Sequence, residues 1–403
     1  MKSIRSFIRG DKIIWMVLLL LCIISLIEVS SSIGKYAYDR NTSTIFLAFK
    51  HFGIICATFV VSVIVSHINH RKFAQLSIPG YYISVILLVV ALILYITNSS
   101  DKAAGRWLPI PIIGQFQPSE IAKFILVVYV AHLLAKSQEK IKELDTFKQI
   151  LLPIIVVSGL ILPQNLSTAG LVFVSCFVMM FLGNVNKKYW SIIAGTGVVA
   201  FIIGLTILTV TYRTNDLQNE DSIFRTTTWG GRISEWLSTE YENDTQANIA
   251  RRAIAIGGLT GNHPGSTVQG RLLSESHNDF IYAIIIEELG SIGGILVLLL
   301  YTALFYRCVV IASKSTTLFK ALTVSGIGFT IYLQALINMG VAVGVLPVTG
   351  QTLPFISYGG TSYMISGCAI GIIQSIANSN KVARDNMKAQ EENNNEEDNN
   401  KNQ

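Results

Sequence analysis

The sequence predicts an all-α integral membrane protein with ten transmembrane helices. Half of its 403 residues are hydrophobic (51%) and only 14% are charged, which suits a bilayer protein better than a large soluble core. Apolar runs recur along the chain, and lysine and arginine are concentrated in short loops that all fall on one side. These observations exclude a soluble globular domain.

Windows of about 20 residues locate the expected helices. The fifth and sixth are short, and the first follows basic residues, as a signal peptide would. The first run is long and further spans follow it, so we interpret it as a signal anchor. The ten expected spans are Ile13–Ser32, Ile45–Ser66, Tyr81–Thr97, Ser119–Ala135, Ile150–Leu162, Ala169–Leu182, Tyr189–Val210, Phe280–Tyr306, Ala321–Ala342 and Thr361–Ala377.

The distribution of basic residues predicts the orientation. If the N-terminus is cytoplasmic, every short inner loop is basic, as the positive-inside rule requires. The outer loops around Gln164 and between Val343 and Pro354 then carry no lysine or arginine. An even number of spans places the C-terminus in the cytoplasm as well. The formal net charge of +6 reflects this topology rather than nucleic-acid binding.

We expect one membrane domain over residues 1–380 and a disordered cytoplasmic tail over residues 381–403, which is rich in Asn and Glu. The five cysteines lie scattered in or beside apolar runs without paired spacing. They predict neither a disulfide framework nor a metal site. No organic cofactor is expected.

The longest connection, residues 212–278 between the seventh and eighth helices, lies on the outer side. Within it, Gln246–Ile256 is expected to form a short helix on the membrane surface. All its basic residues are arginines, whose planar guanidinium groups can bind phosphate through two hydrogen bonds. Arg225 and Arg232 are therefore candidate ligands of an anionic substrate. The alternative is that these arginines pair with the carboxylates of the same loop.

A second outer segment leads into the fourth span. Ser119 is a plausible N-cap, and Glu120 is favoured by the helix dipole. Lys123 lies about one turn inside the span, where a buried ammonium needs a partner or a wet cavity. Two interpretations remain open for Lys123: a structural salt bridge with Glu120 or another helix, or contact with a ligand.

The cluster from Glu275 to Phe280 is polar and leads directly into an apolar run. A carboxylate fixed where water meets lipid suits chemistry on a membrane-borne substrate. Asp279 is the candidate for that chemistry, with His277 and Glu275 as supporting groups.

Glu287 and Glu288 follow within the expected eighth span. Neighbouring residues of a helix point about 100° apart, so at least one of these carboxylates faces the bundle interior. We expect a structural or gating role, in which the carboxylate either pairs with a cation such as Lys123 or stays protonated.

The third outer segment, Leu346–Ser362, contains two prolines and three glycines, which exclude a continuous helix. Irregular backbone near the bilayer is tolerated only where protein or water covers it. The segment is a candidate cavity lining, and the alternative is a simple turn between two helices.

Together these segments resemble the shape, elongation, division and sporulation family of bacterial membrane glycosyltransferases. The resemblance covers nearly the whole chain except the tail, and it is closer to the division members than to the elongation members. The matching motifs are Gly105-Arg106-Trp107 with Gln117-Pro118-Ser119-Glu120-Ile121-Ala122-Lys123, His277-Asn278-Asp279-Phe280 with Glu287-Glu288-Leu289-Gly290, and Leu353-Pro354-Phe355-Ile356-Ser357-Tyr358-Gly359-Gly360-Thr361-Ser362.

This resemblance implies polymerisation of lipid II, an undecaprenyl-diphosphate-linked disaccharide pentapeptide, into glycan strands on the outer face of the bacterial cytoplasmic membrane, at the division septum. It implies a class B penicillin-binding protein and other division membrane proteins as partners. Asp279 occupies the position of the family's essential aspartate. The motifs also make the following residues candidate substrate contacts: Arg106, His277, Ser357, Tyr358, Gly359 and Gly360.

The expected reaction needs only one carboxylate. A glycosidase uses a second carboxyl group to protonate a poor leaving group, whereas a diphosphate leaves without that proton. As a hypothesis, Asp279 takes the proton of the acceptor hydroxyl, while arginines, Lys123 or a bound Mg²⁺ or Mn²⁺ stabilise the departing diphosphate. Asp279 could instead ligate the metal. A lipid II flippase and a noncatalytic scaffold are the competing functions.

Overall fold

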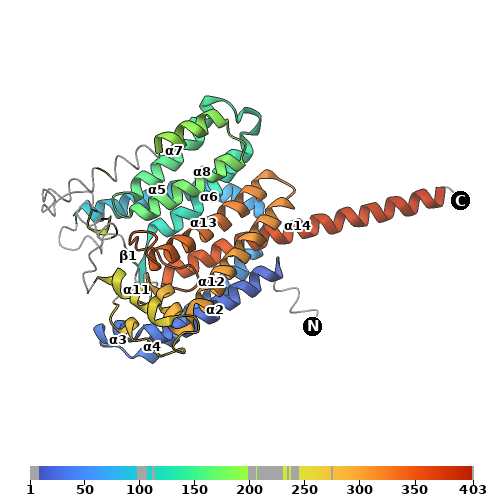
Figure 1. The fold of residues 1–403 in the computed structure, drawn as a ribbon. Coiled ribbons are helices and arrows are strands. Elements are labelled where there is room, and N and C mark those ends of the chain that lie inside the picture. Colours follow the sequence, from blue (N-terminus) through green and yellow to red (C-terminus); the bar gives the residue numbers. More distant parts are fainter. Residues whose placement is uncertain are drawn as a thin grey trace.

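The computed structural model describes residues 9–97, 107–110, 114–197, 206, 230–233, 236, 245–273 and 276–401. Within these ranges the protein is a bundle of helices with one short hairpin, which confirms the all-α membrane class (Figure 1). Seven helices are long and apolar enough to cross a membrane: α2 (Lys12–Ser32), α4 (Thr44–Ser66), α5 (His70–Thr97), α6 (Pro118–Lys136), α7 (Leu144–Ile161), α12 (Ile281–Ser313) and α13 (Leu318–Ala342).

The remaining elements are shorter, apart from the long last helix. These elements are α3 (Gly34–Asp39), the hairpin of β1 (Leu108–Ile110) and β2 (Gly114–Phe116), η2 (Gln138–Lys140), α8 (Leu166–Leu182), α11 (Gln246–Gly257), η3 (Gln269–Arg271) and α14 (Gly360–Lys401). Among them, α11 confirms the short helix expected in the long loop.

Several helices begin earlier than the apolar runs that predict them. The third begins at His70 rather than Tyr81, and the fifth at Leu144 rather than Ile150. Apolarity marks the part of a helix that meets lipid, whereas its hydrogen bonds continue through polar residues. The expected seventh span, Tyr189–Val210, is helical over residues 187–197, and most of its remainder lies outside the described residues.

The expected uninterrupted helix from Phe280 to Tyr306 is wrong at one point. Gly290, with φ 72° and ψ −179°, breaks α12. Beyond the break, the N–H of Ser291 donates to the Gly258 carbonyl (2.9 Å), and the residue after it donates to the carbonyl of residue 259 (3.3 Å). The loop after α11 therefore supplies hydrogen bonds that α12 gives up.

The two parts of α12 have different surroundings. Residues 281–286 are all buried, whereas large apolar side chains after the break, such as Ile292 and Leu299, are exposed. Residues 291–313 alone are long enough to cross a bilayer, which takes about 20 residues of α-helix. The part before Gly290 thus lies within the protein, and the part after it has the surface of a membrane span.

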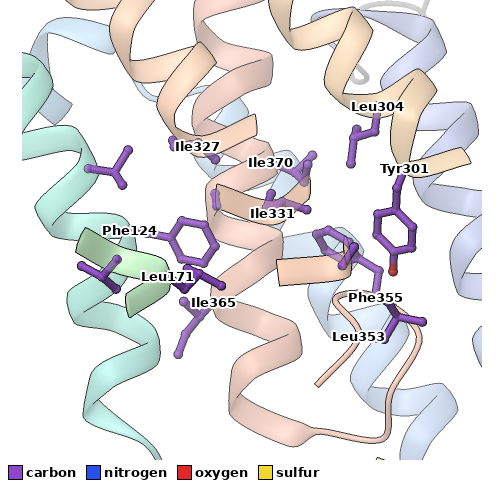
Figure 2. Packing of buried hydrophobic residues seen from close by; sticks show 14 of the residues in the cluster. Phe124, Leu171, Tyr301, Leu304, Ile327, Ile331, Leu353, Phe355, Ile365 and Ile370 are labelled. Carbon is purple, nitrogen blue, oxygen red and sulfur yellow. The ribbon is translucent and has the colours of Figure 1, made fainter. Parts of the chain in front are cut away.

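The hydrophobic core is built around α13 and α14. Figure 2 shows side chains from several helices meeting there, among them Phe124, Leu171, Ile327, Ile331, Ile365 and Ile370. On α14, Gly367 and Gly371 lie one turn apart, and a Cβ on Gly371 would come within 2.6 Å of Val65 Cβ on α4. Small residues at this spacing allow close packing of membrane helices.

Contacts of α2 define the two ends of the bundle. At its start, Asp11 exchanges hydrogen bonds with Gln374 of α14 and forms an ion pair with Arg307 of α12. At its end, the Ser32 carbonyl accepts a hydrogen bond from Ser276 (3.2 Å). We call these the Asp11 end and the Asp279 end.

Beyond the bundle, α14 continues to Lys401 and projects away from the other helices (Figure 1). Residues 381–401 are therefore helical, where the sequence predicts a disordered tail. Their Asn-rich and Glu-rich sequence provides no apolar face for packing, and the helix simply prolongs the buried segment that precedes it.

Candidate active site

The main chain of Asp279 is fixed just before α12. Its carbonyl accepts a hydrogen bond from Nδ2 of Asn338 on α13 (2.8 Å). The same nitrogen donates to the Gln351 carbonyl (2.6 Å), and the Gln351 side chain donates to Thr168 Oγ1 on α8 (2.7 Å). Asn338 therefore fixes the position of Asp279 relative to the irregular segment, residues 343–359.

The carboxylate of Asp279 and the guanidinium of Arg232 lie beside the same glycine. Gly350 has φ 68°, and a Cβ placed on it would lie 3.6 Å from Asp279 Oδ2 and 3.9 Å from Arg232 Nη1. Arg232 also donates to the Val348 carbonyl (3.2 Å). The structure thus brings together two of the residues that the sequence predicts for the site. A carboxylate next to a cation can accept a proton while the cation stabilises a developing anion.

Ser357 and Tyr358 bind the turn that carries Asp279. Ser357 Oγ donates to the Asn278 carbonyl (2.7 Å) and accepts from the N–H of residue 353 (2.7 Å). The N–H of Tyr358 donates to the His277 carbonyl (2.8 Å). Ser357 is 3% exposed, so its contacts position the site rather than face solvent.

Most residues from Gln351 to Ser357 of the irregular segment are buried, as the sequence predicts for backbone near a bilayer, whereas Val343 and Val345 at its start are exposed. Its residue Phe355 has φ 64° and is buried beside Tyr301 (Figure 2). Side chains from four helices donate to its carbonyls. Gln334 of α13, Tyr301 of α12, Tyr363 of α14 and Ser25 of α2 donate to the carbonyls of residues 352, 354, 355 and 356, respectively.

Lys123 forms the buried ion pair with Glu120 that is one of its two expected roles. Its ammonium donates to Glu120 Oε2 (3.0 Å) and Gln334 Oε1 (2.6 Å), and the side chain has no exposed surface. Nε2 of the same Gln334 side chain donates a hydrogen bond to the carbonyl of Thr352 (3.0 Å). The buried ion pair therefore supports the irregular segment, and Lys123 itself does not reach the surface beside Asp279.

His277 belongs to an aromatic cluster with Tyr36 and Tyr358, whose ring centroids lie 4.6 and 5.7 Å from its own. Burial, assisted by the positive charge of Arg40, lowers the pKa of His277 from 6.5 to about 4. The imidazole is therefore neutral at neutral pH. It fits a supporting role and not that of a second acid.

Comparison with known proteins places the chain in a family. The family model described as cell cycle protein, FtsW/RodA/SpoVE, matches residues 11–382. The chain belongs to this family. It is 31% identical to the probable peptidoglycan glycosyltransferase FtsW of Escherichia coli O6:H1 over 93% of this chain and 87% of the relative. The corresponding protein of Coxiella burnetii is 33% identical over 74% of this chain and 78% of the relative.

Two solved structures share the fold of this FtsW/RodA/SpoVE member. One is a chain from a peptidoglycan synthase complex, with a TM-score of 0.70, 23% identity, and coverage of 91% of this chain and 97% of that chain. The other is the rod shape determining protein RodA of Thermus thermophilus, with a TM-score of 0.61, 20% identity, and coverage of 92% and 98%.

Glu287 and Glu288 anchor the loop after α11 in this family member and do not pair with Lys123, which was one of the expected alternatives. Glu287 accepts from Thr267 Oγ1 (2.6 Å) and from the N–H groups of residues 268 and 269 (2.8 and 3.0 Å). Glu288 accepts from Ser31 and from the N–H groups of residues 265 and 267. Each carboxylate thus satisfies several donors of the same loop.

The remaining candidate residues are two glycines at the start of α14 and three residues outside the described ranges. Gly359 and Gly360 lie at the start of α14, and a Cβ on Gly360 would meet nothing within 4 Å. Arg106, Arg225 and Glu275 lie outside the described residues.

The described residues do not assemble a protein cage for a metal. Within the part of the chain that the structure describes, no group of three or more His, Cys, Asp or Glu side chains could hold an ion. A magnesium ion is often bound by one or two carboxylates together with substrate phosphates. The single carboxylate of Asp279 fits that kind of site.

Sequence reasoning missed the amides of α13. Gln334 and Asn338 are four residues apart, so they lie on one face of a helix that is otherwise largely apolar. That spacing is the signal that could have found them, because intramembrane polar side chains usually face a partner. Their partners in the irregular segment depend on the tertiary fold.

Proposed function

We propose that this protein is a peptidoglycan glycosyltransferase that polymerises lipid II on the outer face of the cytoplasmic membrane, in septal cell-wall synthesis during division. The observation that carries the proposal is that the side chains of Asp279 and Arg232 lie beside Gly350, among buried polar groups at one end of a membrane bundle. The relatives named probable peptidoglycan glycosyltransferases support the same reaction.

In the proposed reaction the acceptor sugar hydroxyl attacks the anomeric carbon of the donor lipid. A new C–O bond forms, the bond to the diphosphate breaks, and its electron pair leaves with the diphosphate. The hydroxyl proton passes to Asp279. Arg232, with Arg225 and Arg106 as further candidates, offsets the negative charge that develops on the leaving group.

Asn338 and Ser357 position Asp279 through main-chain hydrogen bonds. His277 and Tyr358, with the glycines 359 and 360, are proposed to line the path of the substrate. In the alternative role, Asp279 would ligate a bound Mg²⁺ or Mn²⁺, and the ion would supply positive charge to the leaving group.

For the membrane arrangement we propose ten spans, both termini in the cytoplasm, and the loop of residues 212–278 outside. Residue 11 and Gln374 of α14 hydrogen-bond at one end of the bundle, which supports an even number of crossings between them. A class B penicillin-binding protein and other division proteins are the proposed partners. The structural neighbour from a peptidoglycan synthase complex supports such a partnership.

The proposal is tested with purified protein, lipid II and divalent cation in liposomes. Asp279→Asn removes the base with little change in shape, so we expect glycan polymer to fall by at least 100-fold. Asp145→Asn, which changes an exposed carboxylate far along the chain, is the matched control.

Polymer from Asp279→Asn at the wild-type rate would refute the catalytic role of Asp279. Movement of lipid II across the liposome membrane without polymer would instead favour the flippase. If neither polymer nor lipid movement occurs in the wild type, with its transpeptidase partner also supplied, the scaffold is favoured.

A further inference from the structure

A basic cavity lies at the Asp11 end, on the side of the bundle away from Asp279. It has a volume of about 360 Å³ and lies between the start of α2, the end of α12 and the middle of α14. Five cationic side chains line it: Lys12, Arg307, Lys314, Lys381 and Arg384. Asp11 is the one carboxylate among its lining residues.

Both carboxylate oxygens of Asp11 already have partners within the protein. One carboxylate oxygen pairs with Arg307, and the other accepts from the N–H groups of residues 13 (2.9 Å) and 14 (3.2 Å) at the start of α2. The other four cations make no ion pair within the described ranges. The cavity therefore carries a surplus of positive charge.

Two buried polar atoms of the cavity's lining residues lack partners among the described residues. Nε of Arg307 is a buried donor without an acceptor, and Oδ1 of Asn380 is a buried acceptor without a donor. The rest of the Asn380 amide is engaged, since Nδ2 donates to Ser315 (2.9 Å) and Asn380 is 4% exposed. Both atoms are shielded from solvent in this structure, so a ligand in the cavity reaches them only after the side chains turn toward it.

The surroundings of the cavity are those of a lipid headgroup site. Above it on α2 and α12, the apolar side chains Ile13, Met16, Tyr306 and Val309 are 40–63% exposed, as lipid-facing residues are. A phosphate at the cavity would thus have room for its acyl chains along the same two helices. Basic pockets between transmembrane helices are suited to anionic headgroups.

We propose that this cavity binds the phosphate diester of an anionic membrane lipid such as phosphatidylglycerol. The phosphate oxygens meet the four unpaired cations that line the cavity. The site is separate from the proposed glycosyl transfer and does not depend on it.

The test is native mass spectrometry of the full chain in detergent with phosphatidylglycerol, phosphatidylcholine or inorganic phosphate. The variant Lys314→Gln/Lys381→Gln/Arg384→Gln removes three exposed cavity cations. The matched control Lys136→Gln/Lys140→Gln/Lys142→Gln removes three exposed cations at the end of α6 and in the loop after it. At about 1 kcal/mol for each of the three cations, we expect the cavity variant to bind phosphatidylglycerol on the order of 100-fold more weakly, and the control to bind as the wild type does.

Equal retention of phosphatidylglycerol by the cavity variant and the wild type would overturn the proposal. An equal loss in the cavity variant and the control would also overturn it, because it would mean attraction to surface charge in general. Binding of inorganic phosphate that competes with the lipid and depends on the same cations would keep the phosphate site but refute the lipid as its source. Thermal unfolding of each variant establishes that it is folded.

Discussion

The two ends of the bundle hold their charges in opposite ways. At the Asp279 end, Lys123 has no exposed surface and is paired with Glu120. At the Asp11 end, Lys314, Lys381 and Arg384 are exposed and make no ion pair among the described residues. Buried and paired groups keep one geometry, which chemistry requires. Exposed, unpaired side chains can adjust to a ligand that comes and goes.

The largest expected effect comes from breaking the buried pair. Lys123→Met leaves the Glu120 carboxylate buried without its cation and removes a donor to Gln334. Loss of one partner from a buried ion pair destabilises a protein by roughly 3–5 kcal/mol. We therefore expect a large drop in the thermal unfolding temperature of the purified protein, together with loss of polymer as the irregular segment loosens.

The chain contains a matched control for this variant. Lys148 and Asp145 have the same spacing in sequence, but their side chains are 65% and 87% exposed and 3.9 Å apart. Lys148→Met should change stability by less than about 0.5 kcal/mol, since an exposed pair is worth little. Similar losses in the two variants would contradict the contrast between buried and exposed charge. The double variant Lys123→Met/Glu120→Gln should recover part of the lost stability, because no charge is then left unpaired.

The next largest effect concerns pH. Because burial lowers the pKa of His277 from 6.5 to about 4, the unfolded chain binds a proton more readily than the folded protein between these values. The stabilisation is complete above pH 6.5 and is lost as the pH falls toward 4. We expect a loss of ~2 kcal/mol in the free energy of unfolding between pH 7.5 and pH 5.

The measurement is chemical unfolding in detergent across that pH range, for the wild type, His277→Asn and His263→Asn. The pH dependence should shrink in His277→Asn. It should persist in His263→Asn, because His263 is exposed. An unchanged pH dependence in His277→Asn would show that the proton binds elsewhere.

Sequence patterns predict the helices well, because a bilayer demands long apolar runs. They also predict Asp279 as a carboxylate at the edge of an apolar run, and Arg232 as an arginine of a loop without lysine that could bind phosphate. In the structure the side chains of both residues lie beside Gly350. Asn338 holds Asp279 through a main-chain carbonyl, and no residue type marks a carbonyl that needs a donor.

The break in α12 was beyond sequence reasoning for a related reason. Residues 289–294 are apolar or small and contain no proline, so they read as part of a helix. The break is stable because the carbonyls of Gly258 and Leu259 accept from the N–H groups after Gly290. Those partners lie about 30 residues away in the chain, and only the tertiary structure brings them there.

The smallest expected effect tests the geometry at Gly350. Its φ of 68° is unfavourable for any residue with a Cβ, and that atom would also contact the carboxylate of Asp279 and the guanidinium of Arg232. Gly350→Ala should cost roughly 1–2 kcal/mol of stability from the backbone alone. The methyl group would also take up space beside the two charged groups that the substrate needs, so we expect a loss of about tenfold in the polymerisation rate, equivalent to about 1.4 kcal/mol.

Gly265 provides the control that separates these two causes. It has φ 85°, but a Cβ on it would meet nothing within 4 Å. Gly265→Ala therefore carries the same kind of backbone strain without crowding the site, and we expect similar destabilisation with near-normal polymerisation. Polymerisation by Gly350→Ala at the rate of Gly265→Ala would mean that the Asp279 end tolerates movement. The proposed contrast between a fixed end and an adaptable end would then fail where it matters most for the reaction.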